Sequence, residues 1–265
     1  MKTPTVLVFS LSKIWRYRPV NVRVLQTNYL AMKITKAVSV FLFCLSCPGS
    51  GQEIPAFISA LEGTTVASQT PAEAPDDWLL AHIDVETTGL VPGYHEMIDI
   101  GIIMTDLKGK EIDRLFLRIM PDHPERTAPG ARAVNGFSVD LWNERGFVTT
   151  SEAVEHMVAF HKIVAGNKDV LFVAYNAWFD ISFVDHLFRA SGRTWRELYH
   201  YFVLDLPSMA WGLGIHDLGG QGMSDKLKVV PETSDPLKHT GISGAASNVD
   251  VYRAILRLNN PKNRS

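Results

Sequence analysis

The stretch HIDVETTGL, residues 82–90, decides the fold of this chain. The apolar residues 78–83 that lead into it predict a buried strand, which runs into two acids and then turns at a glycine. Because side chains two positions apart on a strand point the same way, Asp84 and Glu86 share one face. Two carboxylates at a strand end can hold a divalent cation through their oxygen atoms. A merely solvated acidic tip would also explain such a pair, so a cation site needs partners elsewhere in the chain.

The composition and the charge distribution limit the classes of protein to consider. A chain of 265 residues with 46% hydrophobic and 20% charged residues suits one domain of roughly 150–200 residues plus additional sequence. Residues 1–52 carry seven Lys or Arg and no acid, which leaves 19 basic against 28 acidic residues, a net charge of −9, in the remainder. So acidic a region is poorly suited to wrapping long duplexes, but metal ions could let it bind a short single strand. Both cysteines, Cys44 and Cys47, lie in the first quarter, so the remainder has no thiol metal site and no disulfide.

The amino-terminal quarter differs from the rest in pattern. Residues 1–31 show no clean period, and we expect an unstructured leader there. From Met32, a basic start, an apolar run of about 11 residues and small residues afterwards fit a secretory signal peptide over residues 32–51. The run is shorter than the roughly 20 residues that a membrane-spanning helix needs, so no stable span is expected. This pattern predicts translation from Met32 and export, for example to a periplasm. The alternative is a disordered or misassigned leader on a cytoplasmic protein.

Residues 52–76 are typical of a linker, and residues 77–260 form the remaining domain.

The remaining domain alternates strand and helix patterns. A tight-turn signal at Lys108-Gly109 joins two strand patterns into a β-hairpin beside the first strand. We expect Ser151 to cap a helix. This alternation predicts an α/β fold with a mixed sheet and helices on both faces. The predicted strands are 97–105, 112–119 and 169–174, and the predicted helices are 129–134, 176–190, one starting at 204–207, and 243–258.

A second motif, NAWFD at residues 176–180, follows the strand pattern of residues 169–174. Asn176 and Asp180 are four positions apart, so both lie on one helix face near its amino end. A capped helix with an incidental acid would explain this spacing too. However, DVETTGL resembles the first motif of the DEDD 3′–5′ exonucleases, and NAWFD resembles their second motif, N-A-x-F-D. This family includes proofreading exonuclease domains, oligoribonuclease and ribonuclease T. The resemblance covers about residues 77–260 and implies the ribonuclease H-like fold, with a mixed five-stranded sheet.

The resemblance also implies a reaction and its residues. Asp84, Glu86 and Asp180 would bind two divalent metal ions, Mg²⁺ or Mn²⁺, and would be catalytic together with His239. The enzyme would hydrolyse phosphodiester bonds at the 3′ ends of single-stranded DNA or RNA and release nucleoside 5′-monophosphates. His239 would act as general base, for which the ordinary histidine pKa of about 6.5 is suitable near neutral pH.

The last motif departs from the family pattern. Members with a histidine carry H-x-A-x-x-D, whereas this chain has HTGISG at residues 239–244, with Gly244 in place of the fourth acid. A second alignment would make Asp250 the acid and put Ala245 at the histidine position. We prefer the first alignment because it leaves a longer helix after the motif. The missing acid predicts weaker binding of one metal ion, and the alternative function is a catalytically impaired module that binds nucleic-acid ends without cutting.

The resemblance implies substrate contacts as well. The turn after the first acids would contact the 3′-terminal nucleotide, and Asp205 is interpreted as structural. Three aromatic side chains, Trp142, Trp178 and Phe179, are expected in the core, although each could offer a stacking face. The expected substrate-binding residues are Thr87, Thr88, Leu90, Asn135 and Asn176.

Overall fold

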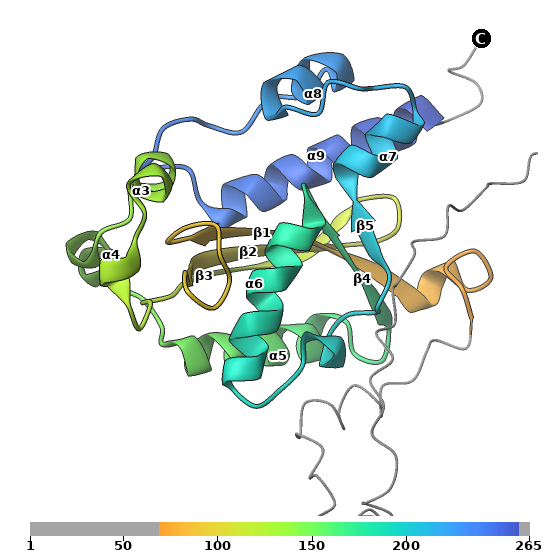
Figure 1. Cartoon of the computed structure of the whole chain (residues 1–265). Coiled ribbons are helices and arrows are strands. Elements are labelled where there is room, and N and C mark those ends of the chain that lie inside the picture. The colour runs from red at the N-terminus through yellow and green to blue at the C-terminus, as the bar shows by residue number, and fades with distance from the viewer. Residues whose placement is uncertain (1–68, 260–265) are drawn as a thin grey trace, which may run out of the picture. The chain divides into compact units, whose positions relative to one another are not determined.

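The computed structural model describes residues 69–259 (Figure 1). The expected leader, the expected signal peptide and most of the expected linker, residues 1–68, lie outside the described residues. Residues 70–77, where that linker meets the expected domain, form a turn and a short 3₁₀ helix, η1 (Pro75–Asp77). In the described part of the chain, no helix has both the length and the apolar character needed to cross a membrane.

A mixed five-stranded sheet, in the order β3-β2-β1-β4-β5, forms the centre of the domain. The first strand β1 pairs antiparallel with β2 and parallel with β4, and β4 pairs parallel with β5. Nearly every residue of β1 is buried because both faces of the sheet are covered, which explains its near-continuous apolar sequence. The predicted fold class is therefore confirmed. The strands are β1 (Trp78–Thr87), β2 (Met97–Thr105), β3 (Glu111–Arg118), β4 (Asp169–Ala174) and β5 (Val203–Asp205).

Helices cover both faces of the sheet, as Figure 1 shows. Leu79 and Ile83 of β1 pack into the same core as α5 and α6, whereas Trp78 and Leu80 pack with α7, α8 and α9. The prediction of helices on both faces is therefore confirmed. The helices are α3 (Pro129–Asn135), α4 (Val139–Arg145), α5 (Thr150–Val164), α6 (Ala177–Ala190), α7 (Leu206–Gly212), α8 (Gly220–Leu227) and α9 (Gly241–Asn259).

Two local predictions need correction. Thr149, not Ser151, caps α5: its hydroxyl accepts from the Glu152 N–H at 3.3 Å, and the Glu152 carboxylate accepts from the Thr149 N–H at 2.8 Å. This reciprocal pair is a capping box, which satisfies two backbone donors at once. The helix expected to start at 204–207 begins only at Leu206, because the preceding three residues pair with β4 as β5.

The last helix, α9, lies against β1 and β2 at very close range. A side chain at Gly101 of β2 would overlap the backbone of Gly241, and a side chain at Gly241 would overlap the backbone of Asp84, so both positions require glycine. Further along α9, the Asn248 amide donates to the carbonyl of Ile83 at 2.8 Å across 165 positions of sequence. These contacts hold the first turn of α9 directly over the end of β1.

Candidate active site

Three acids from distant parts of the chain meet at the carboxyl end of β1. Asp84 and Glu86 belong to β1, and Asp180 lies in the first turn of α6. The backbone N–H of Val85, between the two β1 acids, donates to Oδ1 of Asp180 at 3.1 Å. This hydrogen bond ties α6 to the acidic strand end, so the structure brings the predicted trio together.

The environment of these acids opposes their negative charge. Burial raises the pKa of Asp84 well above its ordinary value, and repulsion from Asp180 and other nearby acids adds to the effect. Asp84 keeps an exposed edge, but dense packing around its carboxyl group makes desolvation the main cause. Burial likewise raises the pKa of Asp180, against the lowering effect of the Val85 N–H. Within residues 69–259, neither of these two nor Glu86 pairs with a Lys or Arg.

Such a set of acids fits a hard divalent cation. Carboxylate oxygens are the preferred ligands of Mg²⁺ and Mn²⁺, and buried anions without a counterion are costly. Within residues 69–259, no three His, Cys, Asp or Glu side chains are already arranged around a common point as ligands. Glu86 is instead engaged by His239, at 3.0 Å, and by the Asn135 amide, which donates to its Oε2 at 3.2 Å. Binding of an ion at Glu86 therefore requires this carboxylate to exchange hydrogen-bond partners.

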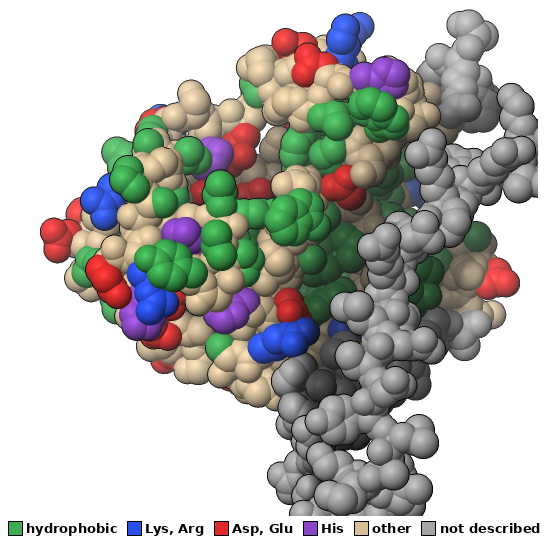
Figure 2. Space-filling model, in the orientation of Figure 1, with side chains coloured by type: hydrophobic (Ala, Val, Ile, Leu, Met, Phe, Trp, Pro, Cys, Tyr) green, Lys and Arg blue, Asp and Glu red, His purple; other side chains and the backbone are tan. Residues whose placement is uncertain are grey.

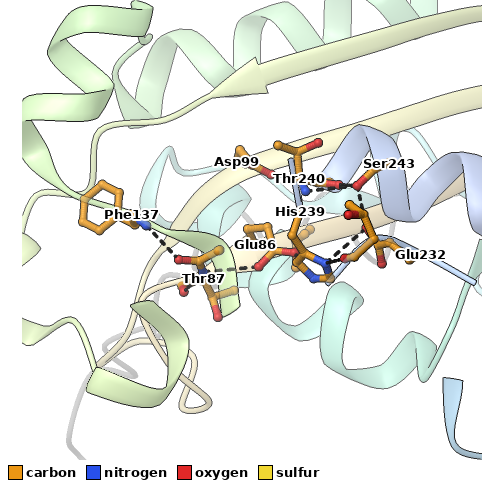
Figure 3. Close-up of polar contacts among 12 residues, drawn as sticks. Glu86, Thr87, Asp99, Phe137, Glu232, His239, Thr240 and Ser243 are labelled. Carbon is orange, nitrogen blue, oxygen red and sulfur yellow. Dashed lines mark hydrogen bonds and ion pairs between the residues drawn. The ribbon is translucent and has the colours of Figure 1, made fainter. Parts of the chain in front are cut away.

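His239 lies in the loop between α8 and α9, with its ring between two carboxylates (Figure 3). Its Nε2 is 3.0 Å from Oε1 of Glu86, and its Nδ1 is 2.9 Å from the carbonyl oxygen of Thr233. The hydrogen bond to Glu86 is the main reason that the pKa of His239 rises to about 9. The expectation of an ordinary pKa near neutrality is thus wrong for this arrangement, in which His239 holds its proton at pH 7.

The first alignment of the last motif agrees with the geometry, and the second does not. Gly244 faces Asp84 so closely that a side chain at this position would overlap the Asp84 carboxyl group. Asp250, the acid of the second alignment, is exposed on α9 and lies 3.4 Å from Arg253. Gly244 therefore occupies the position next to the trio, and α9 itself contributes no acid there.

Two acids that lie near the site were not predicted from the sequence. Glu232, in the loop before α9, accepts a hydrogen bond from the Ser243 hydroxyl at 2.6 Å and lies 3.6 Å from Nδ1 of His239. Asp99 of β2 is fully buried opposite Glu86, and its Oδ1 accepts from the Gly241 N–H at 2.8 Å. Asp99 could have been noticed as one acid inside an apolar strand, whereas nothing in the sequence marks Glu232.

The expected substrate-binding residues divide into two groups. Three of them are buried and shape the turn: Thr87 donates to the Gly89 carbonyl at 2.6 Å, Thr88 accepts from the Glu96 N–H at 2.9 Å, and Asn135 donates to the Thr87 carbonyl at 3.0 Å. The other two reach solvent. Leu90 is 77% exposed, and Asn176 is exposed in a left-handed conformation, φ 62°, immediately before α6.

The aromatic residues also behave differently from one another. Trp142 is buried, and its indole N–H donates to the Ile98 carbonyl at 2.9 Å, so its expected core position is confirmed. Phe179 is partly buried against the core. Trp178 is 65% exposed, so the expectation that it lies in the core is wrong. As predicted, Asp205 is structural: it accepts from the backbone N–H groups of Ala177 and Ser208, each at 3.0 Å.

Figure 2 shows acidic side chains recessed in a hollow on this face of the molecule, with hydrophobic side chains exposed around it. The acids would repel an anionic backbone unless bound cations offset their charge, whereas the exposed apolar groups around them could contact flat bases.

Comparison with known proteins gives a relative and a fold. No protein-family model matches the chain. Over 188 residues the chain is 27% identical to the 3′–5′ DNA exonuclease Cap18 of Escherichia coli, a match that covers 71% of this chain and 96% of that protein. A solved structure of Exonuclease I matches 70% of this chain with a TM-score of 0.56 and 13% identity. A zinc-bound complex of E. coli Exonuclease I with single-stranded DNA matches 69% of it with a TM-score of 0.54 and 14% identity. The match spans 41% of each Exonuclease I chain, and identity this low shows a shared fold.

Proposed function

We propose that the chain is a 3′–5′ exonuclease of the DEDD type, which removes nucleotides from the 3′ ends of single-stranded DNA with the help of divalent metal ions. The observation that carries this proposal is the meeting of Asp84, Glu86, Asp180 and His239 at the end of β1. Asp84, Glu86 and Asp180 would hold the ions, for which Mg²⁺ and Mn²⁺ are the best candidates. The proposed catalytic domain is residues 77–260.

The reaction is hydrolysis of the last phosphodiester bond. A water oxygen attacks phosphorus, the bond from phosphorus to the 3′ oxygen breaks, and that oxygen takes up a proton. The products are a nucleoside 5′-monophosphate and a strand shortened by one nucleotide. When bound, two divalent ions lower the pKa of the attacking water and stabilise the charge on the leaving oxygen.

His239 would accept the proton of the attacking water at Nε2, the atom that faces Glu86. It can do so only when neutral, and the Glu86 hydrogen bond keeps it protonated in the present arrangement. Glu86 must therefore turn away from His239 before the histidine can act as a base. The same carboxylate would serve as a metal ligand, so ion binding and readiness of the base would depend on one side chain.

The substrate proposal combines the relatives with the surface of the site. Cap18 is named a DNA exonuclease, and one Exonuclease I structure holds single-stranded DNA. Leu90 follows the β1 acids in the turn and Trp178 lies two positions before Asp180; both side chains are exposed and would contact unpaired bases. The alternative function, binding of strand ends without cutting, is favoured by one observation, the glycine at position 244.

A single assay tests the proposal against this alternative. The full chain is incubated with a 5′-labelled single-stranded DNA oligonucleotide and Mg²⁺ or Mn²⁺, and the products are separated by size. We expect a ladder of strands that shorten from the 3′ end, no ladder with EDTA, and none with Asp84→Asn. An RNA of the same sequence gives the preference between the two nucleic acids. Binding without shortening in either metal would contradict the proposal and support the alternative.

A further inference from the structure

Gly244 deprives the site of an acid on α9, and the chain offers an acid from another element. Resting on the proposed function, we propose that Glu232, from the loop between α8 and α9, supplies the fourth carboxylate of the metal site.

The contacts of Glu232 place it at the first turn of α9. Its Oε1 accepts from the hydroxyl of Ser243 at 2.6 Å, and Ser243 is the residue immediately before Gly244. The Ser243 hydroxyl is itself held by the backbone of Thr240, whose N–H donates to it at 3.1 Å. Glu232 is thus fixed beside the position from which the missing acid would have pointed (Figure 3).

The space in front of Gly244 explains why the acid comes from a loop. A side chain at position 244 would overlap the Asp84 carboxyl group as it lies in this structure. The glycine therefore leaves room for the Asp84 carboxyl group beside α9, so a further carboxylate has to come from another element. Glu232 approaches in this way, because Ser243 anchors it one residue away.

Charges agree with this placement. The negative charge of Glu232 contributes to the raised pKa of Asp84, after burial and Asp180 and ahead of Glu86. Burial is the main cause that raises the pKa of Glu232 itself, and Glu86 adds to it. Glu232 thus belongs to the same group of mutually repelling carboxylates as the trio at the end of β1.

Its remaining bonding capacity also suits a ligand. The hydrogen bond and the ion pair of Glu232 both use Oε1, and within residues 69–259 its Oε2 has no hydrogen-bond partner. Among the described residues, Glu232 forms an ion pair with His239, at 3.6 Å, and with no Lys or Arg. Three ionised acids carry three negative charges, whereas two divalent ions carry four positive charges. With Glu232 as a fourth carboxylate, the negative charge of the acids equals the positive charge of the ions.

The main alternative role is structural: Glu232 could only hold Ser243 and His239 in place. Two substitutions separate the roles. Glu232→Gln keeps an oxygen that accepts from Ser243 but removes the charge. Ser243→Ala removes the hydrogen bond but keeps the charge. A metal ligand is sensitive to the first change, and a structural support is sensitive to the second.

The experiment measures Mn²⁺ binding to the metal-free full chain through the electron paramagnetic resonance signal of free Mn²⁺. We expect Glu232→Gln to weaken the binding of one ion by about 10-fold or more. Ser243→Ala should weaken it by about threefold or less, the effect of one modest hydrogen bond. Glu144→Gln, which alters an exposed acid on α4 that has no hydrogen bond or ion pair with the four carboxylates, should bind as the wild type does.

The outcomes separate this inference from the proposed function. If Asp84→Asn loses Mn²⁺ binding while Glu232→Gln binds as tightly as the wild type, the role of Glu232 is refuted and the metal-dependent exonuclease stands. A larger loss in Ser243→Ala than in Glu232→Gln would refute it as well and support the structural role. If the wild type neither binds Mn²⁺ nor shortens DNA, the proposed function itself fails.

Discussion

Nε2 of His239 lies 3.0 Å from Oε1 of Glu86, so the expected base and an expected metal ligand are hydrogen-bonded to each other. This contact raises the pKa of His239 to about 9. In the metal-free protein, Glu86→Gln should lower that pKa toward 6.5, because the amide cannot stabilise the imidazolium charge. An NMR titration of the imidazole protons checks the shift, with Glu144→Gln as the control. An unchanged pKa in Glu86→Gln would mean that other groups hold the proton.

The buried carboxylate of Asp180 should lower the stability of the metal-free protein. Burial and nearby acids raise its pKa well above the ordinary range, so its charge is unfavourable at neutral pH. Asp180→Asn keeps the oxygen that accepts from Val85 but removes the charge. We expect a higher melting temperature, by about 2–4 °C for each kcal/mol gained, together with loss of nuclease activity. Thermal unfolding in EDTA checks this, and a lower melting temperature would contradict it.

The contact between Gly101 and Gly241 should be intolerant of any side chain. Gly101→Ala would force its methyl group into the backbone of α9, so we expect a loss of about 1–3 kcal/mol in the free energy of unfolding. Gly130→Ala is the matched control, because nothing lies near its added methyl group in α3 and alanine favours a helix. Urea unfolding of both variants gives the comparison. Equal stabilities would show that α9 can shift at little cost.

Trp178 should contribute to binding of single strands and little to stability. Its side chain is 65% exposed at the start of α6, and stacking on one base is worth about 1–3 kcal/mol. Trp178→Ala should therefore weaken DNA binding by about 5- to 150-fold and leave the melting temperature nearly unchanged. Ile163→Ala, at a position 81% exposed on α5, is the control for loss of an exposed apolar group. Fluorescence anisotropy with catalytically inactive protein checks the affinities, and equal affinities would exclude stacking on Trp178.

Asp99 should make stability depend on pH. Burial raises its pKa from 3.8 to about 8, opposed by the Gly241 N–H, Arg118 and His239 and reinforced by Glu86. Because the folded state holds this proton more tightly than the unfolded state, the contribution is complete below pH 4 and is lost as pH rises toward 8.

Asp99→Asn keeps an oxygen for the Gly241 N–H and cannot lose a proton there. Relative to the wild type, the variant should gain up to about 1.4 kcal/mol in stability for each pH unit between 4 and 8. Urea unfolding across that range checks the difference. Parallel curves for the two proteins would mean that Asp99 does not titrate there.

The long elements of the fold were predictable because their patterns are strong. The apolar strands β1, β2 and β4 and the amphipathic helix α6 have the lengths that their sequences indicate. The short elements were not predictable. Strand β5 has three residues and is defined by pairing with β4, and α8 begins at a glycine and contains a second one, residues that do not favour a helix. Tertiary contacts, rather than local preference, determine both.

The site was predictable where a motif marks it and not elsewhere. Asp84, Glu86 and Asp180 were expected together and lie together. The raised pKa of His239 depends on its distance from Glu86, which no sequence pattern contains. Glu232 lies in a loop, so the number of residues between it and the motifs does not predict that it lies near the site.

The bond from Asn248 to Ile83 joins the last helix to the first strand across 165 residues. A nascent chain has β1 and its two acids long before α9 is made, and the loop that carries His239 cannot settle beside Glu86 until that helix docks. The contact between His239 and Glu86 therefore joins the two ends of the described domain and can form only after α9 has been made.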